Sequence, residues 1–484
     1  MRDITQQFID NRWVPSQADR RLSVVDPYRE QVLGTVTAGH PDDVDTAVAA
    51  ARRALPAWRD MGGVGRAGFI EAFADGLESR KPTLVELSST NNGKIRAEAA
   101  LDLEDAIACY RYYAQQAREL DTRQNRPVEV AMPGVLAERR EEAAGVVGLI
   151  TPWNFPLVTS AWKTAPALAA GCTVVLKPSE VTPLPESVLV DVALECGLPA
   201  GVFNMVFGDG EGVGAPLSRH RGIDRISFTG SNPVGESVMR EAAAGTRNVA
   251  LELGGKSPIV VLDDADPEQA ADWIMAGLYF NAGQICSATS RLIVDETIAE
   301  PVYTALADRI DGLVLGDPLA EVTSMGPLTS ASQRARVRGY LATAEVEGLK
   351  VVRDARHRVL PDTGYFVAPT LYRDVPTSSR LWCEEIFGPV LCGHSVCGEA
   401  GAIALANDSD FGLAATVVAG DQQRARRVAS FIDAGTVWFN SEQLVLPQAG
   451  WGGMKRSGIG RELGPGGLAE YLEVKHVIGP ASTG

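Results

Sequence analysis

The stretch from Gly145 to Leu176, GVVGLITPWNFPLVTSAWKTAPALAAGCTVVL, decides the fold class of this 484-residue chain. It is the longest apolar stretch of the sequence, yet it is interrupted by Pro152, Asn154, Pro156, Lys163 and Pro166. A membrane-spanning helix needs about 20 consecutive apolar residues, so these interruptions argue against a membrane span. The pattern instead predicts a strand at 146–150, a helix at 157–170 and a strand at 173–176. A strand, helix and strand in this order form the repeating unit of a parallel α/β sheet.

The same alternation continues on both sides of this stretch. Helices are predicted before it at 42–58, 65–91 and 98–120, and after it come a helix at 184–196 and strands at 203–206, 223–228 and 248–252. A second series follows, with strands at 258–261, 291–294, 390–395, 415–418 and 436–439 and helices at 267–280, 297–311, 401–407 and 421–432. We therefore expect two doubly wound, Rossmann-like α/β domains. The boundary is placed near Gly254-Gly255, where paired glycines allow the chain to change direction.

Two strand-like segments fit neither series. Residues 124–144 contain strand-like runs at 128–130 and 136–140, and residues 467–479 contain another at 471–474. From the residues alone, these segments could form a small separate sheet or hairpins that fold onto the body of the protein.

Composition narrows the class of partner. The formal net charge is −16, and 45% of the residues are hydrophobic and 22% charged, which is typical of a globular protein. Such an acidic chain is a poor partner for nucleic acid or an anionic membrane. Five histidines without an HxH or CxxC cluster give no basis for a metal site.

The cysteines and the first residues bear on the compartment. The seven cysteines are scattered and odd in number, so we expect no disulfide framework and a reducing, cytoplasmic environment. Residues 1–6 contain no apolar core of a signal peptide.

Two glycine-bearing segments carry a nucleophile and a base. Phe280-Asn281-Ala282-Gly283-Gln284-Ile285-Cys286-Ser287 offers a thiol, and Leu251-Glu252-Leu253-Gly254-Gly255 offers a carboxylate at the end of an apolar strand. Covalent catalysis by a thiol yields a thioester, and a base that activates water can hydrolyse it. An isolated cysteine is more often a small buried apolar residue, and an isolated glutamate is usually solvated.

These two segments resemble the active-site Cys and Glu signatures of the NAD(P)-dependent aldehyde dehydrogenase superfamily, and the resemblance extends from about residue 7 to residue 478. It implies that Cys286 adds to an aldehyde to give a thiohemiacetal and then a thioester. Glu252 would activate the hydrolytic water, and its presence favours a free acid over transfer to coenzyme A. Asn154 matches the family's oxyanion stabiliser, and Glu462 matches a carboxylate that relays protons in some members.

The resemblance also implies how the domains divide the work. Residues 1–123 and 145–254 would bind NAD, residues 255–463 would form the catalytic domain, and residues 124–144 and 464–484 would form an oligomerisation segment. A homodimer or a homotetramer is expected.

The expected cofactor is NAD. Lys177-Pro178-Ser179-Glu180 follows a strand, at the sheet edge where nucleotides bind, and a carboxylate at Glu180 would accept bonds from ribose hydroxyls and repel a 2′-phosphate. Gly230-Ser231-Asn232-Pro233-Val234-Gly235 opens a helix whose amides can face a pyrophosphate. The resemblance assigns cofactor contacts to Trp153, Lys177, Ser179, Glu180, Gly230, Ser231, Gly235, Leu253, Glu385 and Phe387.

Several segments resemble the betaine-aldehyde and aminoaldehyde branch. Four aromatic residues, Phe155, Trp162, Phe280 and Trp451, could surround a cationic head group through cation–π attraction. Asp102 and Asp105 resemble carboxylates near the substrate entrance in that branch. Phe280 and Phe155 stand where plant members carry Trp and Tyr, which suits an apolar or aryl aldehyde better.

Two other classes of function stay open. A cysteine hydrolase without redox chemistry normally needs a base such as histidine beside the thiol, and no histidine falls within the quoted segments. A non-catalytic scaffold protein would not require Cys286, Glu252 and Asn154 together.

Overall fold

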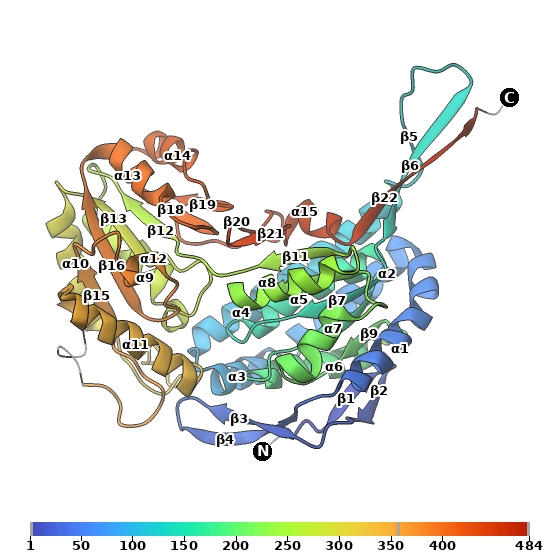
Figure 1. Cartoon of the computed structure of the whole chain (residues 1–484), viewed down its shortest axis with the longest axis horizontal. Helices are drawn as coiled ribbons and strands as arrows, with labels where there is room; N and C mark the ends of the chain where they lie inside the picture. Colours follow the sequence, from blue (N-terminus) through green and yellow to red (C-terminus); the bar gives the residue numbers. More distant parts are fainter. Residues whose placement is uncertain (1–2, 355, 357–358, 482–484) are drawn as a thin grey trace.

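The computed structural model describes residues 3–354, 356 and 359–481, and its two large sheets lie at opposite ends of the molecule (Figure 1). The predicted ranges 1–123, 255–463 and 464–484 include residues 1–2, 355, 357–358 and 482–484, which lie outside the described residues. The α/β fold class is confirmed, because parallel strands alternate with helices in both sheets.

The first sheet has eight strands in the order β2-β1-β9-β8-β7-β10-β11-β21. Its five parallel strands are β9 (Phe203–Met205), β8 (Thr173–Lys177), β7 (Val146–Ile150), β10 (Arg225–Thr229) and β11 (Asn248–Glu252). The edges are antiparallel: β1 (Gln6–Ile9) and β2 (Arg12–Pro15) at one side, and β21 (Gly458–Ile459) at the other. β7 and β8 are buried throughout, as the continuous apolar sequence of a sheet covered on both faces requires.

Helices pack over both faces of this sheet. They are α1 (Pro41–Asp60), α2 (Gly62–Glu78), α3 (Lys81–Asn92), α4 (Arg96–Asp121), α5 (Pro156–Ala170), α6 (Pro183–Glu195), α7 (Ala215–Arg219) and α8 (Asn232–Ala243). The predicted single helix at 65–91 is wrong, because the chain breaks it at Ser79 and Arg80. Pro82 lies in the first turn of α3, where a proline starts a helix but cannot continue one.

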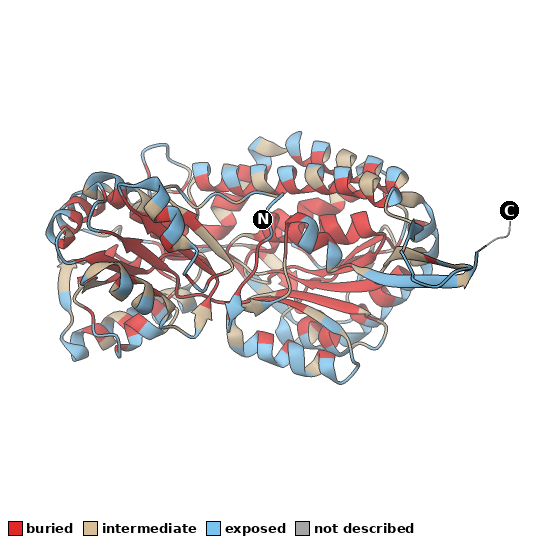
Figure 2. Ribbon diagram, turned by 90° about the horizontal axis from the view of Figure 1, so that it is seen from above, coloured by how far each residue is buried: buried red, intermediate tan, exposed pale blue. Residues whose placement is uncertain are grey.

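The second sheet has seven strands in the order β14-β15-β16-β13-β12-β18-β19. The strands are β12 (Pro258–Val261), β13 (Arg291–Asp295), β14 (Lys350–Arg353), β15 (Thr370–Arg373), β16 (Val390–Val396), β18 (Ala414–Val418) and β19 (Thr436–Phe439), and only β14 runs antiparallel to its neighbour. Its helices are α9 (Pro267–Leu278), α10 (Ala299–Gly312), α11 (Ala331–Glu347), α12 (Arg380–Cys383), α13 (Gly398–Asn407) and α14 (Gln422–Ala429). In each half of the molecule the sheet is the buried layer, and the helices of that half cover it (Figure 2).

The chain crosses between the two sheets twice. It leaves the first sheet after β11 and returns at β21, and these two strands are antiparallel neighbours that pair Leu251 with Ile459 and Glu252 with Gly458. The predicted range 255–463 therefore contains a strand that belongs to the first sheet.

A third sheet projects from the body beside the first sheet (Figure 1). It contains β5 (Arg126–Pro127), β6 (Val135–Ala143) and β22 (Leu472–Pro480), and β22 pairs with β6 from Leu472 opposite Ala143 to Pro480 opposite Val135. The predicted strand at 128–130 is displaced, because β5 ends at Pro127. Val474 and Ile478 of β22 are 52% and 69% exposed.

The remaining short elements are β3 (Arg21–Asp26) paired with β4 (Gln31–Thr37), β17 (Phe411–Gly412) paired with β20 (Met454–Lys455), and α15 (Gly464–Ala469). Within the described part of the chain, no helix is both long enough and apolar enough to cross a membrane.

Candidate active site

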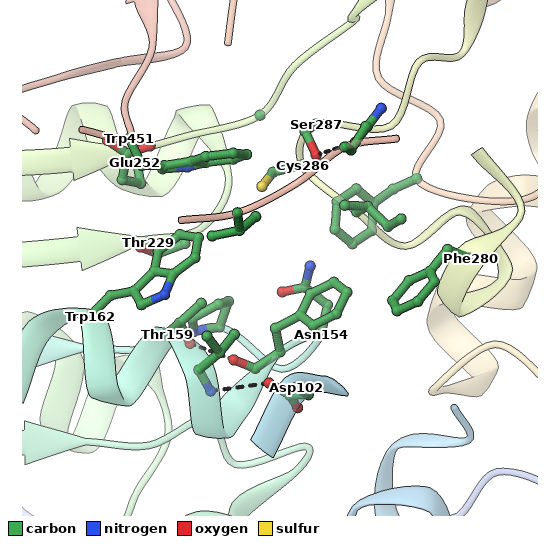
Figure 3. Close-up of a pocket in the computed structure, with 18 of the residues that line it drawn as sticks. Asp102, Asn154, Thr159, Trp162, Thr229, Glu252, Phe280, Cys286, Ser287 and Trp451 are labelled. Atoms are coloured by element: carbon green, nitrogen blue, oxygen red, sulfur yellow. Dashed lines mark hydrogen bonds between the residues drawn. The ribbon is translucent and has the colours of Figure 1, made fainter. Parts of the chain in front are cut away.

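A cavity of about 520 Å³ lies between the two sheets, a size typical of small-molecule sites (Figure 3). All the predicted catalytic and substrate residues line it, together with Trp153, Gly230, Ser231, Leu253, Glu385 and Phe387. The other predicted cofactor residues, Lys177, Ser179, Glu180 and Gly235, do not line it. The cavity therefore brings together side chains that are far apart in the sequence and come from both sheets.

Cys286 enters the cavity from a strained loop. The loop begins with a turn at Phe280–Gly283, in which Asn281, Ala282 and Gly283 have left-handed, non-helical φ values of 48°, 52° and 77°. Asparagine enters this left-handed region more readily than other non-glycine residues, but alanine does not, so neighbouring contacts must hold Ala282 there. Burial raises the pKa of the Cys286 thiol to about 12, and the nearby carboxylate of Glu252 adds to the effect.

Asn154 lies in the loop after β7, facing the nucleophile loop. Its amide nitrogen donates to the carbonyl oxygen of Gln284 at 2.9 Å. Asn92, at the end of α3, donates to the carbonyl oxygens of Trp153 at 2.8 Å and of Asn154 at 3.3 Å. These bonds fix the orientation of the Asn154 amide, whose nitrogen carries a second N–H that can serve the cavity.

Glu252 ends β11 and is only 4% exposed. Burial raises its pKa well above the ordinary range, and repulsion from Glu462 adds to this rise. The Oε2 atom of Glu252 has no hydrogen-bond partner among the described residues. A buried carboxyl with a raised pKa suits proton transfer.

Glu462 lies beside Glu252 with its own cation. Its carboxylate forms a salt bridge with Lys163 of α5 and accepts a hydrogen bond from Ser227 of β10 at 3.2 Å. The backbone of Glu462 is bound to that of Trp451 by hydrogen bonds in both directions. The Lys163 ammonium, which lies inside the apolar stretch that defined the fold, therefore balances one of the two buried carboxylates.

Glycines 254 and 255 are explained by close approach. A Cβ atom on Gly254 would lie 2.6 Å from Glu385 Oε2, and one on Gly255 would lie 2.6 Å from the carbonyl oxygen of Cys286. The sequence prediction related this pair to a change of direction, but its physical requirement is space for Glu385 and for the nucleophile loop. Glu385 also accepts a hydrogen bond from the Gly255 amide at 3.0 Å.

The loop of Glu385 and Phe387 is held by α11. Phe387 is left-handed, with φ of 62°, and its carbonyl oxygen accepts a bond from Gln333 at 2.6 Å. Arg336 donates to the carbonyl oxygen of Glu385 at 2.7 Å. The Phe387 ring meets Trp153 edge-on, with the ring centroids 5.3 Å apart. Burial raises the pKa of Glu385 to about 7.

The predicted nucleotide residues follow the carboxyl ends of β8 and β10, the two strands that flank β7. Lys177 ends β8, and its ammonium binds Glu180 Oε2 at 3.1 Å. Ser231 precedes α8 without a capping bond from its side chain, so the first amides of the helix are not satisfied by that side chain. Gly235, inside α8, packs against Leu253, and a Cβ there would lie 2.4 Å from the end of that side chain, which would have to move.

The four predicted aromatic residues form two pairs. Trp162 and Trp451 have ring centroids 5.4 Å apart, and Phe155 and Phe280 are stacked at 6.1 Å. Figure 3 places Trp162 and Trp451 on one side of Cys286 and Phe280 on the other.

The two predicted aspartates differ in their surroundings. Asp102 is buried, with its carboxylate 3.0 Å from the Lys94 ammonium, and it accepts a hydrogen bond from the Val158 amide at 3.0 Å. Both of its oxygens are therefore paired within the protein. Asp105 is half-buried, and burial with the nearby charge of Asp102 raises its pKa to about 7. Of the two, Asp105 retains the carboxylate better placed to meet a ligand.

Several residues that line the cavity were not predicted from the sequence. Gln333 and Arg336 lie on α11, which was not predicted because only Val337, Tyr340 and Ala344 of its 17 residues are buried. Thr229, Gln443 and Leu444 also line the cavity. Lys163 carried a usable signal, because a lysine inside an apolar run is rarely buried without a partner.

Comparison with known proteins gives one consistent result. The aldehyde dehydrogenase family model matches residues 13–477. A chloroplastic aminoaldehyde dehydrogenase of Arabidopsis thaliana is 43% identical over 98% of this chain and 95% of its own length. A chloroplastic betaine aldehyde dehydrogenase of Beta vulgaris is 42% identical over 99% of this chain and 96% of its own length.

Solved structures agree with the sequence matches. Betaine aldehyde dehydrogenase of Staphylococcus aureus in complex with NAD+ superimposes with a TM-score of 0.94 at 39% identity, covering 98% of this chain and 94% of that one. The NAD+ complex of an aldehyde dehydrogenase from Bacillus cereus gives a TM-score of 0.95 at 38% identity, covering 99% of this chain and 97% of that one.

Proposed function

The chain belongs to the aldehyde dehydrogenase family, and we propose that it oxidises a cationic aldehyde, of the aminoaldehyde or betaine aldehyde type, to the carboxylic acid with NAD. The observation that carries the chemistry is the single cavity shared by Cys286, Glu252 and Asn154. A thiol, a base and an amide donor are the groups that covalent oxidation through a thioester requires.

Each of these residues has one task. The Cys286 sulfur attacks the aldehyde carbon and forms a thiohemiacetal. The second N–H of the Asn154 amide stabilises the oxyanion, since the first is bound to Gln284. Glu252 then accepts a proton from water, which attacks the thioester and releases the acid. Glu462 and Lys163 lie beside Glu252 and offer a route for that proton toward Ser227.

The residues present fit NAD. Space for the Glu385 carboxylate is kept open by Gly254, which has no side chain. Glu385 would bind the nicotinamide ribose, Phe387 and Trp153 the ring, and Glu180 with Lys177 the adenosine ribose, while the start of α8 would face the pyrophosphate. When bound, NAD supplies a hydride acceptor for the thiohemiacetal.

The substrate class rests on the lining of the cavity and on the relatives. Trp162 and Trp451 are close enough to share a cationic head, and Asp105 adds a carboxylate to the same cavity. Both Arabidopsis and Beta relatives carry names of enzymes for such aldehydes.

An apolar or aryl aldehyde is the second candidate. Leu101 and Leu444 line the cavity and are 46% and 56% exposed, so they offer an apolar rim. Asp102, which could have attracted a cation, is instead neutralised by Lys94.

Initial rates of NADH formation distinguish the two. The panel is betaine aldehyde, 3-aminopropionaldehyde, 4-aminobutyraldehyde, hexanal and phenylacetaldehyde. A kcat/KM at least tenfold higher for the cationic members, equal to about 1.4 kcal/mol, supports the cation site. A preference for hexanal or phenylacetaldehyde overturns it and leaves the dehydrogenase chemistry standing.

Assembly and compartment are proposed on separate grounds. We propose a homodimer or homotetramer that uses the projecting sheet, whose edge strand β22 exposes Val474 and Ile478. Light scattering of a Val474→Lys/Ile478→Lys variant tests it, and an unchanged mass contradicts it. A reducing, cytoplasmic compartment is proposed because all seven cysteines are free; the plant relatives carry chloroplastic or peroxisomal names.

A further inference from the structure

Glu98 connects the two halves of the active site without lining the cavity. It lies in the first turn of α4, is 5% exposed and is absent from the cavity wall. Its Oε2 atom accepts the amide of Ile95 at 3.0 Å, which closes the start of α4. Its Oε1 atom accepts the amide of Asn281 at 2.8 Å, a residue 183 positions further along the chain. Both carboxylate oxygens are therefore occupied by backbone donors.

The residue that Glu98 binds begins the strained turn before the nucleophile. Asn281 and Ala282 are both left-handed, and neither is glycine. Gly283 continues the turn and packs so closely on Gly388 that a Cβ would lie 2.2 Å from the carbonyl oxygen of that residue. A non-glycine residue keeps this conformation only where surrounding contacts favour it, and the bond from Glu98 is such a contact.

Asn281 is hydrogen-bonded to both segments that carry the proposed reacting groups, Asn154 and Cys286. Its side-chain amide donates to the carbonyl oxygens of Asn154 at 3.2 Å and Gln284 at 3.4 Å. Gln284 returns a bond from its own amide to the Asn281 carbonyl at 2.9 Å, and it precedes Cys286 by two residues. A shift of Asn281 would therefore move the oxyanion donor and the nucleophile relative to each other.

We propose that Glu98 is a positioning residue, which holds the left-handed turn at Asn281 and thereby sets the placement of Cys286 against Asn154. The inference rests on the proposed roles of those two residues. The carboxylate is matched to this task because it can accept both amide N–H groups, whereas a glutamine in its place has one acceptor oxygen. Burial raises the pKa of Glu98 to about 7, and the charge of Lys94 opposes that rise.

The test compares Glu98→Gln with the double variant Glu98→Gln/Ala282→Gly. Glycine relieves the left-handed strain at position 282 and so reduces the need for the bond from Glu98. We expect NADH formation in the first turnover to be at least tenfold slower in Glu98→Gln than in wild type. In the double variant this rate should recover at least threefold, with Ala282→Gly alone as the reference. The second readout is the rate at which iodoacetamide alkylates Cys286 without NAD. This rate should change at least threefold in Glu98→Gln and should return toward the wild-type value in the double variant.

A matched control separates positioning from simple loss of a helix cap. Asp421→Ala removes a side chain that caps α14 through the amide of Arg424 at 2.9 Å, and α14 packs on β18 and β19. It should lower the melting temperature without changing the burst rate. If Glu98→Gln behaves in the same manner, or if Ala282→Gly restores nothing, Glu98 only caps α4 and the inference is overturned.

The wild-type enzyme checks the underlying function. It should form about one NADH per subunit in the first turnover, and Cys286→Ala should abolish this. A wild type that forms no NADH in the first turnover overturns the proposed function together with the inference, whereas normal first-turnover NADH formation that Glu98→Gln leaves unchanged overturns the inference alone.

Discussion

The ammonium of Lys94 lies 3.9 Å from the centre of the Phe155 ring, so one face of this cavity-lining ring already carries a cation. The same ammonium binds Asp102 at 3.0 Å, and both charged side chains are fully buried. The π density of Phe155 is thus already engaged by a cation whose charge Asp102 balances. Cation recognition in this cavity must therefore depend on the tryptophans more than on Phe155.

Trp451→Ala is expected to raise KM for betaine aldehyde about 5–30-fold more than KM for hexanal, since a cation–π contact is worth roughly 1–2 kcal/mol. Phe155→Leu should raise both KM values by similar factors. Trp451→Phe, which retains an aromatic face, is the matched control and should keep most of the discrimination. Equal effects of Trp451→Ala on the two substrates would remove Trp451 as a cation site.

Asn154→Ala is expected to lower kcat about 100–1,000-fold, because one oxyanion donor is lost. The dissociation constant for NAD, measured by quenching of tryptophan fluorescence, should stay within about threefold, a free-energy change well under 1 kcal/mol. Asn92→Ala loosens the same loop, through its bonds to Trp153 and Asn154, but removes no donor from the cavity. It should cost less than tenfold in kcat, and similar losses in both variants would assign the effect to the loop.

Glu252→Gln is expected to separate the two halves of the reaction. Without the base, the thioester forms but is hydrolysed slowly, so rapid mixing should show a burst of about one NADH per subunit followed by a steady state at least 100-fold slower than wild type. Intact-protein mass spectrometry should detect the acylated enzyme. A variant that turns over at the wild-type rate would exclude Glu252 as the base.

The pH dependence of kcat should reveal the repulsion between the two buried glutamates. Glu252 works as a base only when deprotonated, and its raised pKa means that kcat falls as the pH falls through that value. Glu462→Gln removes a negative neighbour and lowers the pKa of Glu252. The pH at which kcat falls should therefore be lower in this variant. Glu470 raises the pKa of Glu252 less than Glu462 does, so Glu470→Gln is the control and should cause a smaller shift. If kcat of Glu462→Gln instead fell at a higher pH than that of wild type, this electrostatic assignment would be contradicted.

The wild-type enzyme should prefer NAD to NADP in kcat/KM, and Glu180→Ala should reduce that preference. The substitution removes a repulsive carboxylate and releases Lys177, now 3.1 Å from Glu180, to bind a 2′-phosphate. Glu236→Ala, which removes a surface carboxylate paired with Arg456, is the control and should leave the ratio unchanged. A wild type with the higher kcat/KM for NADP would show that Glu180 does not select the cofactor.

Strong apolar patterns made the parallel strands predictable. The strands at 146–150, 248–252, 258–261 and 436–439 have the predicted bounds, because each is a short apolar run between helices or glycines. The antiparallel strands β1–β4 and helix α11 were not predicted, since their apolar residues are few and are buried by segments distant in the sequence.

The site was predictable where a residue type itself carries chemistry. Cys286, Glu252 and Asn154 stood in recognisable segments, and the structure gathers them in one cavity. The contacts of Glu98 with Asn281 and of Lys94 with Phe155 could not be foreseen, because each depends on how the two halves of the chain dock. Asp102 was expected near the substrate entrance, and its pairing with Lys94 gave no signal in the sequence, because Lys94 lies eight residues earlier and outside α4.

The pairing of β11 with β21 makes residues 253–457 an insertion between two adjacent strands of the first sheet. Both connections to the inserted half lie side by side, so any opening or closing of the enzyme would be a rotation about this double connection. Glu252 is itself part of the pair and would stay nearly still, whereas Cys286 and Glu385 belong to the half that turns. The proposed base thus lies at the pivot, and a small rotation would alter the distance from Cys286 to Glu252 while leaving Glu252 aligned with Lys163 and Glu462.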